Sequence, residues 1–163
     1  MKNDKPAKEN GTEAPEFTMP DDSAAYALAE AAGWHLLDKV AQDVVVMDLR
    51  GRSDVCDFFV LGSGQSANQV RALAKHLHNE LLGAGHKPKG LEGMNDGRWA
   101  LLDFFDVVVH VFDVKAREYF QLEKLWGDAP RRDLDPAWFT DPAVAARHPD
   151  LNFTFANGSG APD

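Results

Sequence analysis

The sequence predicts an α/β fold, a mixed β-sheet of about five strands with helices packed on it. Residues 43–49 are rich in valine, which favours a buried strand, and residues 66–83 carry apolar side chains at the spacing of an amphipathic helix. Residues 97–112 have the pattern of a β-hairpin. Helices interspersed with strands along a chain are typical of a sheet covered by helices, and a hairpin adds an antiparallel pair.

The first half of the predicted order is one helix followed by two strands. We expect the helix to begin after Ser23, whose hydroxyl can cap exposed amide groups, and to end near Ala41. The buried strand at 43–49 follows. A polar connection at 50–57 then leads to a second, short strand at 58–61.

The clearest helix in the sequence lies at 66–83. Ser66 and Gln69 have the separation of a capping box, in which side chains satisfy the free amides at a helix start. Gly83 and Gly85 favour an end to the helix. Its apolar residues fall on one face: Val70, Leu73, Ala74, Leu77 and Leu81.

The second half of the predicted order is three strands and a helix. We expect an edge strand near Lys87–Glu92, because Pro88 lacks the N–H that a central strand would donate. The hairpin at 97–112 supplies two more strands. A final short helix is expected from about Lys115 to Trp126.

Alternation along the hairpin gives it two different faces, because successive strand residues point to opposite sides. A two-residue turn at Phe104 and Phe105 would place three pairs opposite each other: Trp99 with His110, Leu101 with Val108, and Asp103 with Asp106. One face would then consist of Trp99, Leu101, Val108, His110 and Phe112. The other would consist of Ala100, Leu102, Val107, Val109 and Val111.

The two faces favour different environments. The entirely apolar face suits packing beneath helices. The face that combines Trp99 with His110 has the composition of an interface centre. The alternative is that both residues are buried beneath the last helix or the C-terminal segment. The hairpin residues alone leave both interpretations open.

Composition and charge disfavour several classes of function. The net charge of −9 disfavours broad binding to nucleic acid, DNA included, and favours a basic protein partner. No apolar run is long enough to span a membrane. Cys56 is the single cysteine, so no intrachain disulfide can form, which fits a reducing compartment. The N-terminus has no signal-peptide pattern, so we expect a cytoplasmic location.

We expect three segments along the 163 residues. Residues 1–22 are polar and contain proline, which favours a disordered N-terminal tail. Residues 23–134 form one domain, large enough to bury a proper core. Residues 135–163 form a C-terminal extension that is partly packed or flexible. Its four aromatic residues suggest that it covers the hairpin face in the free protein.

A glycine-rich segment raises an alternative based on nucleotide chemistry. Gly62-Ser63-Gly64 joins a strand to a helix, and amides at a helix start attract phosphate groups. A similar Gly-Ser occurs in nucleotidyltransferases, where two downstream acids hold catalytic metal, but residues 71–79 contain no carboxylate. The alternative is a degenerate nucleotide-binding protein or enzyme that uses Gly62, Ser63, Asp103 and Asp106.

No catalytic or metal-binding set assembles from the sequence. His76 and His78 are two residues apart, so they point away from each other on a helix. Cys56 lacks the second cysteine of a zinc site, and the neighbouring carboxylate of Asp57 disfavours its thiolate. We therefore expect no cofactor, no metal ion and no enzymatic activity.

Seven short motifs occur in order within residues 23–134. They are Asp48-Leu-Arg-Gly-Arg-Ser, Asp57-Phe-Phe-Val-Leu-Gly-Ser-Gly-Gln-Ser, Gly85-His-Lys-Pro, Glu92-Gly, Gly97-Arg-Trp-Ala-Leu-Leu-Asp, Asp106-Val-Val-Val-His-Val-Phe and Leu122-Glu-Lys-Leu-Trp-Gly-Asp-Ala-Pro. Each motif alone is a weak indication. Together they resemble the ribosomal silencing factor (Iojap) family.

The resemblance implies a translation regulator that is not an enzyme. Members of this family bind the large ribosomal subunit through its protein fourteen (uL-fourteen), where the small subunit would join. Translation falls as a result when nutrients are short. The resemblance also implies a role in large-subunit biogenesis, a homodimer in the free state, and a fold similar to a nucleotidyltransferase without its catalytic acids.

The resemblance further implies a protein-binding site on the hairpin. The motif tryptophan of the family corresponds to Trp99, which we expect to anchor the ribosomal partner. Leu101 and Asp103 join it by strand parity, and His110 joins it by the predicted pairing. A polar rim is expected from three further residues: Lys87, Glu92 and Tyr119.

Overall fold

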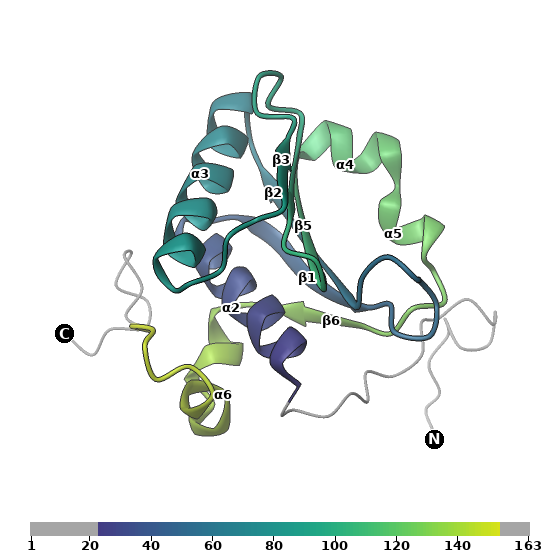
Figure 1. The fold of residues 1–163 in the computed structure, drawn as a ribbon. Helices are drawn as coiled ribbons and strands as arrows, with labels where there is room; N and C mark the ends of the chain where they lie inside the picture. The colour runs from purple at the N-terminus through teal and green to yellow at the C-terminus, as the bar shows by residue number, and fades with distance from the viewer. Residues whose placement is uncertain (1–22, 154–163) are drawn as a thin grey trace.

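The computed structural model describes residues 23–153, which form one six-stranded sheet with helices on both faces (Figure 1). The strands are β1 (Gln42–Asp48), β2 (Phe58–Gly64), β3 (Gly90–Glu92), β4 (Trp99–Asp103), β5 (Val107–Asp113) and β6 (Arg131–Leu134). The α-helices are α2 (Ala24–Asp38), α3 (Ala67–Gly83), α4 (Val114–Phe120), α5 (Leu122–Leu125) and α6 (Pro142–Ala146), and η1 (Pro136–Thr140) is a 3₁₀ helix. The predicted N-terminal tail at 1–22 and the end of the predicted extension lie outside the described residues.

The sheet is mixed, which confirms the predicted fold class. Its strand order is β3-β4-β5-β2-β1-β6, in which β2 and β5 run parallel and the other neighbours run antiparallel. Helices α2 and α3 cover one face, and α4 and α5 lie on the other (Figure 1). No helix within residues 23–153 is long and apolar enough to cross a lipid bilayer.

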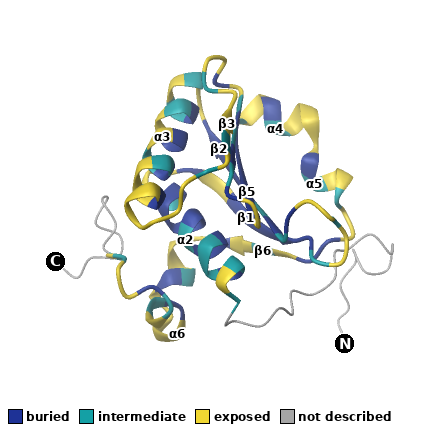
Figure 2. Ribbon diagram, in the orientation of Figure 1, coloured by how far each residue is buried: buried dark blue, intermediate teal, exposed yellow. Residues whose placement is uncertain are grey.

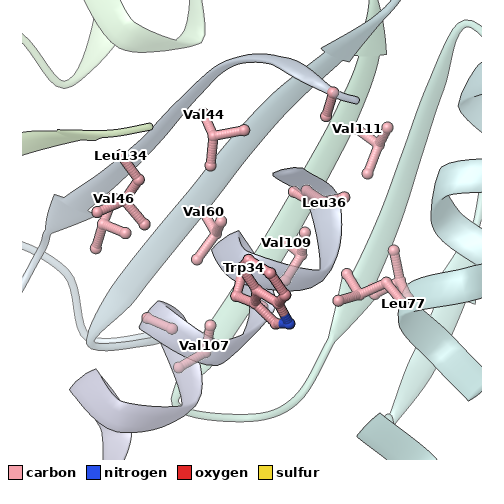
Figure 3. Packing of buried hydrophobic residues seen from close by; sticks show 14 of the residues in the cluster. Trp34, Leu36, Val44, Val46, Val60, Leu77, Val107, Val109, Val111 and Leu134 are labelled. Carbon is pink, nitrogen blue, oxygen red and sulfur yellow. The ribbon is translucent and has the colours of Figure 1, made fainter. Parts of the chain in front are cut away.

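The main core lies between the sheet and helices α2 and α3 (Figure 3). The strands contribute mostly valines to it: Val44, Val46, Val60, Val107, Val109 and Val111. Trp34 of α2 and Leu77 of α3 pack over them. Gly33 allows β6 to approach α2 closely, because a Cβ at this position would lie 2.5 Å from Leu134 Cδ1.

The opposite face of the sheet has a smaller core and a thinner cover. Its buried strand residues are Val45, Met47, Leu61, Val108 and Phe112. Ala116 of α4 and Leu122 of α5 pack against them. These helices have seven and four residues, and their outer surfaces are largely exposed (Figure 2). Residues 23–153 therefore leave part of this sheet face uncovered.

The predicted starts of the two long helices are confirmed by their caps. The Ser23 hydroxyl accepts a hydrogen bond from the Tyr26 amide at 3.2 Å, and the Ser66 hydroxyl accepts one from Gln69 at 3.1 Å. Both hydroxyls satisfy amides that have no partner within the first helical turn.

The structure differs from the sequence-based prediction in one helix end, in the division of the last helix and in an additional strand. Helix α2 ends at Asp38 instead of Ala41, and Val40 has a φ of 66° that no α-helix adopts. The predicted last helix is divided into α4 and α5 by Gln121, whose φ is 51°. Strand β6 was not predicted, because its Arg-Arg-Asp-Leu sequence shows no apolar alternation.

The predicted register of the hairpin is wrong by two residues. The observed pairs are Trp99 with Phe112, Leu101 with His110, and Asp103 with Val108. The predicted pairs, Trp99 with His110, Leu101 with Val108 and Asp103 with Asp106, therefore do not form. The reason is that Phe104 is buried and continues the pairing one residue beyond β4, since its amide donates to the Val107 carbonyl at 2.8 Å.

The turn of the hairpin consequently lies at Phe105 and Asp106. Phe105 has a φ of 76°, and its amide donates to the Asp103 carboxylate at 2.9 Å. A shift of two residues leaves every side chain on the side it would otherwise take. The predicted composition of the two hairpin faces is confirmed, because each set falls into a different core cluster.

The described part of the C-terminal extension, residues 135–153, packs on α2 (Figure 1). The ring centroids of Phe139 and Phe153 lie 5.5 Å and 4.8 Å from that of Trp34. This side of the sheet is opposite to Trp99. The expectation that the extension covers the hairpin face is wrong for these residues, because their aromatic rings find an apolar partner on α2.

Glu30 of α2 is fully buried and binds the extension. Its carboxylate accepts hydrogen bonds from Trp138 Nε1 at 2.7 Å and from Arg147 Nε and Nη2 at 2.9 Å and 2.8 Å, and His148 Nε2 lies 2.8 Å away. Burial alone would raise the pKa of Glu30, but hydrogen bonds from His148, Arg147, Trp138 and Tyr26 lower it to about 2. An ionised carboxylate therefore ties the extension to α2.

Replacing this carboxylate by an amide, Glu30→Gln, should destabilise the protein by about 3 kcal/mol at neutral pH, because Arg147 then loses its buried counter-ion. The ionised carboxylate contributes its full stabilisation above pH 4.5, its pKa in the unfolded chain. This stabilisation is lost as the pH falls towards 2, its pKa in the folded protein. The difference in the free energy of unfolding between wild type and variant should therefore be smaller at about pH 3 than at neutral pH.

Urea denaturation at both pH values measures this difference. Glu118→Gln, which alters an exposed carboxylate on α4, should stay within about 0.5 kcal/mol of wild type. A Glu30→Gln difference that is the same at neutral and acid pH would contradict the role of the charge.

Candidate protein-binding surface

The uncovered part of the sheet, on the side of α4 and α5, carries a group of large apolar side chains. We call this group the Trp99 surface and define it by five residues: Phe59, Trp99, Leu101, Phe120 and Trp126. Four of them are partly buried against the smaller core, and Phe120 is 43% exposed. They come from β2, β4, α4 and the residue that follows α5, so the surface exists only in the folded chain.

Trp99 lies within this surface, packed between two phenylalanines. Its ring stacks on Phe112 of β5 with a centroid distance of 4.9 Å and an interplanar angle of 30°. Phe120 of α4 lies 4.8 Å from it. Trp99 is therefore neither fully buried nor free in solvent, and part of its ring can be buried by a partner.

The backbone that leads into Trp99 depends on two glycines. Gly93 and Gly97 have φ values of 82° and 73°, which side chains rarely allow. A Cβ on Gly93 would lie 1.9 Å from the Trp99 carbonyl oxygen. These glycines let the connection between β3 and β4 turn tightly against the start of β4.

His110 of β5 holds the indole of Trp99 by a hydrogen bond. Trp99 Nε1 donates to His110 Nδ1 at 3.0 Å. His110 is only 4% exposed, and its burial lowers its pKa to about 3. The imidazole is therefore neutral near pH 7, as an acceptor of this hydrogen bond must be. Of the two alternatives left open by the sequence, burial holds for His110 but not fully for Trp99.

The other predicted site residues lie at different distances from this centre. Leu101 pairs with Glu92 of β3, so both side chains point to the Trp99 side of the sheet. Asp103 is at the end of β4 and caps the hairpin turn. Tyr119 is 76% exposed and its ring lies 5.0 Å from Phe120. Lys87 is exposed in the connection before β3.

Three members of the surface were missed by the sequence analysis. Phe59 pairs with Val108 across β2 and β5, and strand parity would have found it once that pairing was known. Phe120 and Trp126 lie in the Trp99 surface because the chain changes direction at Gln121, between α4 and α5. No local pattern in the sequence indicates that redirection.

Carboxylates gather at the end of the surface formed by the hairpin turn. Burial, together with the charges of Asp103, Asp57 and Asp106, raises the pKa of Cys56 to about 11. The thiol is therefore protonated and unsuited to nucleophilic attack. An apolar centre with an acidic end is complementary to a partner that is apolar and basic.

The residues of the nucleotide-based alternative do not come together. Gly62, Ser63 and Gly64 continue β2 and lie beside the end of β5, whereas Asp103 and Asp106 are at the opposite end of that strand. The predicted connection at Gly62–Gly64 between strand and helix is therefore wrong, because these residues are the end of β2. Within residues 23–153, no group of three or more His, Cys, Asp or Glu side chains is placed to hold a metal ion.

The guanidinium of an arginine from α4 lies beside the hydroxyl of Ser63 in the folded protein. Arg117 of α4 donates to the Ser63 hydroxyl at 2.8 Å and to the Asp43 carbonyl at 2.7 Å. Its guanidinium also pairs with Glu123 at 3.0 Å. The Ser63 hydroxyl is thus fixed by a structural network that joins β1, β2, α4 and α5.

Several known proteins have sequences related to this chain. The family model described as "Ribosomal silencing factor during starvation" matches residues 21–154. The ribosomal silencing factor RsfS of Bacillus subtilis is 46% identical over 98 residues, which cover 60% of this chain and 83% of that protein. A mouse protein named for mitochondrial assembly of the ribosomal large subunit is 30% identical over 89 residues, covering 53% of this chain and 39% of that protein.

Two crystal structures resemble the described fold. One is of a Chromobacterium violaceum protein, with a TM-score of 0.63 and 32% identity over 65% of this chain and 88% of that chain. The other, from Bacillus halodurans, has a TM-score of 0.57 and 41% identity over 67% and 96%. The predicted likeness to nucleotidyltransferases stays a prediction. The family match spans most of the chain, and the chain therefore belongs to the ribosomal silencing factor family.

Proposed function

We propose that this protein binds the large ribosomal subunit through the Trp99 surface and prevents the small subunit from joining. The partner would be protein fourteen of the large subunit (uL-fourteen), and the result would be lower translation when nutrients are limiting. Membership of the family supports the ribosomal target. The observation that carries the docking site is the partly exposed Trp99, held between Phe112 and Phe120 on an otherwise apolar sheet face.

The chemistry of the surface supports a protein partner. Partly buried tryptophans at the centre of an apolar patch are typical binding hot spots, and truncating one commonly costs about 2 kcal/mol or more. The rim of the patch includes Asp103, Glu92, Lys87 and Tyr119. Rim charges mainly affect encounter rate and specificity. Acidic groups at the hairpin end, together with the net charge of −9, favour a basic partner.

This function needs no catalytic step, because a bound protein excludes another from the same place by its volume alone. Action on ribosomes is consistent with the expected cytoplasmic location. A second candidate function is assembly of the large subunit, favoured by the name of the mouse relative. In the free state, two copies could bury their Trp99 surfaces against each other, and binding to the ribosome would then separate such a homodimer.

The variant Trp99→Ala should bind isolated large ribosomal subunits at least about 30-fold more weakly than wild type, because it removes the proposed anchor. Co-sedimentation at a series of protein concentrations measures the affinity. Leu82→Ala is the matched control, since Leu82 is 46% exposed on α3 at the other sheet face. Unchanged affinity of a folded Trp99→Ala protein would reject the proposed site.

Wild-type protein added to separated subunits should lower the fraction that joins, and Trp99→Ala should lower it much less. Sedimentation through a sucrose gradient separates joined ribosomes from free subunits. If wild-type protein binds large subunits but joining proceeds unaffected, steric exclusion of the small subunit is wrong.

Millimolar nucleotide with magnesium should leave the melting temperature unchanged, because Ser63 is engaged by Arg117 and lies far along β5 from Asp103. A ligand at free concentration L that binds the native but not the unfolded state stabilises the protein by RT ln(1 + L/Kd), so the melting temperature rises with ligand concentration. A thermal melt with and without nucleotide is sufficient, and a concentration-dependent increase of several degrees would revive the nucleotide-based alternative.

A further inference from the structure

We propose that His110 is a positioning residue, which fixes the orientation of the Trp99 indole for the partner and does not touch the partner itself. This inference rests on the proposed function of the Trp99 surface. It replaces the sequence-based expectation that His110 is one of the contact residues, and it assigns the residue a defined role in binding.

The aromatic rings around Trp99 restrict the plane of its indole but do not select one orientation of the indole within that plane. The Phe112 ring stacks on the indole at a centroid distance of 4.9 Å, and the Phe120 ring lies tilted against it at 4.8 Å. Apolar ring contacts of this kind tolerate small rotations of the indole at little cost. A hydrogen bond has a narrow angular range, so the contact between Trp99 Nε1 and His110 Nδ1 at 3.0 Å selects one orientation. The indole therefore presents a fixed edge to the outside.

His110 cannot reach a partner directly. It is 4% exposed, and the ring of Phe59 lies 4.4 Å from its own ring at an interplanar angle of 72°. His110 Nε2 is buried and has no hydrogen-bond partner within residues 23–153. The polar contact that the imidazole does make is the one with Trp99. A buried polar ring with this single bond is consistent with orientation of the indole as its role.

The protonation state of His110 allows it to accept the hydrogen bond from Trp99 at any physiological pH. Nδ1 accepts from the indole, so the proton of the neutral ring is on Nε2. Burial alone lowers the pKa of His110, to about 3, and no carboxylate raises it. The hydrogen bond to Trp99 therefore persists throughout the physiological pH range, and orientation of the indole does not change with pH there.

Fixing the indole in advance strengthens binding, because the partner does not have to order it. Immobilising one side chain on association costs an amount that corresponds to about 2- to 10-fold in affinity. The variant His110→Leu replaces the imidazole by an apolar side chain of similar size and so removes the hydrogen-bond acceptor. We expect it to bind large subunits about 2- to 10-fold more weakly than wild type.

A double-mutant cycle with Trp99→Phe separates positioning from contact. Phenylalanine has no N–H to donate, so His110→Leu should cause no further loss in that background. His110→Gln, whose side-chain carbonyl can accept the bond, should recover part of the affinity. A loss of the same size in both backgrounds, or no loss in the wild-type background, would overturn the positioning role.

Nuclear magnetic resonance provides a readout on the unaltered protein. The chain has four tryptophans, and the indole N–H signal of Trp99 is identified by its absence in Trp99→Phe. In the unaltered protein this proton should exchange slowly and show a coupling across the hydrogen bond to His110 Nδ1. Rapid exchange and no coupling would overturn the proposal.

Different results would reject the docking surface and the positioning role of His110. If Trp99→Ala binds large subunits as wild type does, the docking surface itself is rejected, and the role of His110 in binding with it. If Trp99→Ala loses affinity while folded His110→Leu keeps it, the docking surface stands and the positioning role alone is rejected.

Discussion

The alternation of side chains along β4, β5 and β2 is the constraint on which the rest of the structure depends. One set of small apolar residues faces α2 and α3, and the set that contains Trp99 and His110 faces the other way. A slip of one residue would exchange the two sets and bury the polar ring of His110 in the main core. The same pairing therefore specifies both the core and the proposed binding surface.

The two faces of the sheet are covered unequally, and this difference separates stability from binding. On one face, α2, α3 and the described part of the extension enclose the main core, and buried Glu30 ties the extension in place. On the other face, α4 and α5 are too short to cover β4. The described part of the extension, residues 135–153, packs on α2 and does not cover the proposed docking surface.

Sequence alone predicts the features that depend on local patterns. The mixed sheet, the caps at Ser23 and Ser66 and the two hairpin faces follow from periodicity and parity. The hairpin register does not, because it depends on burial of Phe104, which the main core decides. Strand β6 needs the space that Gly33 leaves for Leu134. Phe120 and Trp126 reach the surface through a redirected chain, which only tertiary packing specifies.

Hydrogen–deuterium exchange of the protein bound to large ribosomal subunits tests most directly which face docks. Amides of α4, α5 and the hairpin turn at Phe105 and Asp106 should exchange more slowly in the bound protein than in the free protein. Amides of α2 and of residues 135–153, on the opposite face, should exchange equally in both. Slower exchange confined to α2 and residues 135–153 would contradict docking through the Trp99 surface.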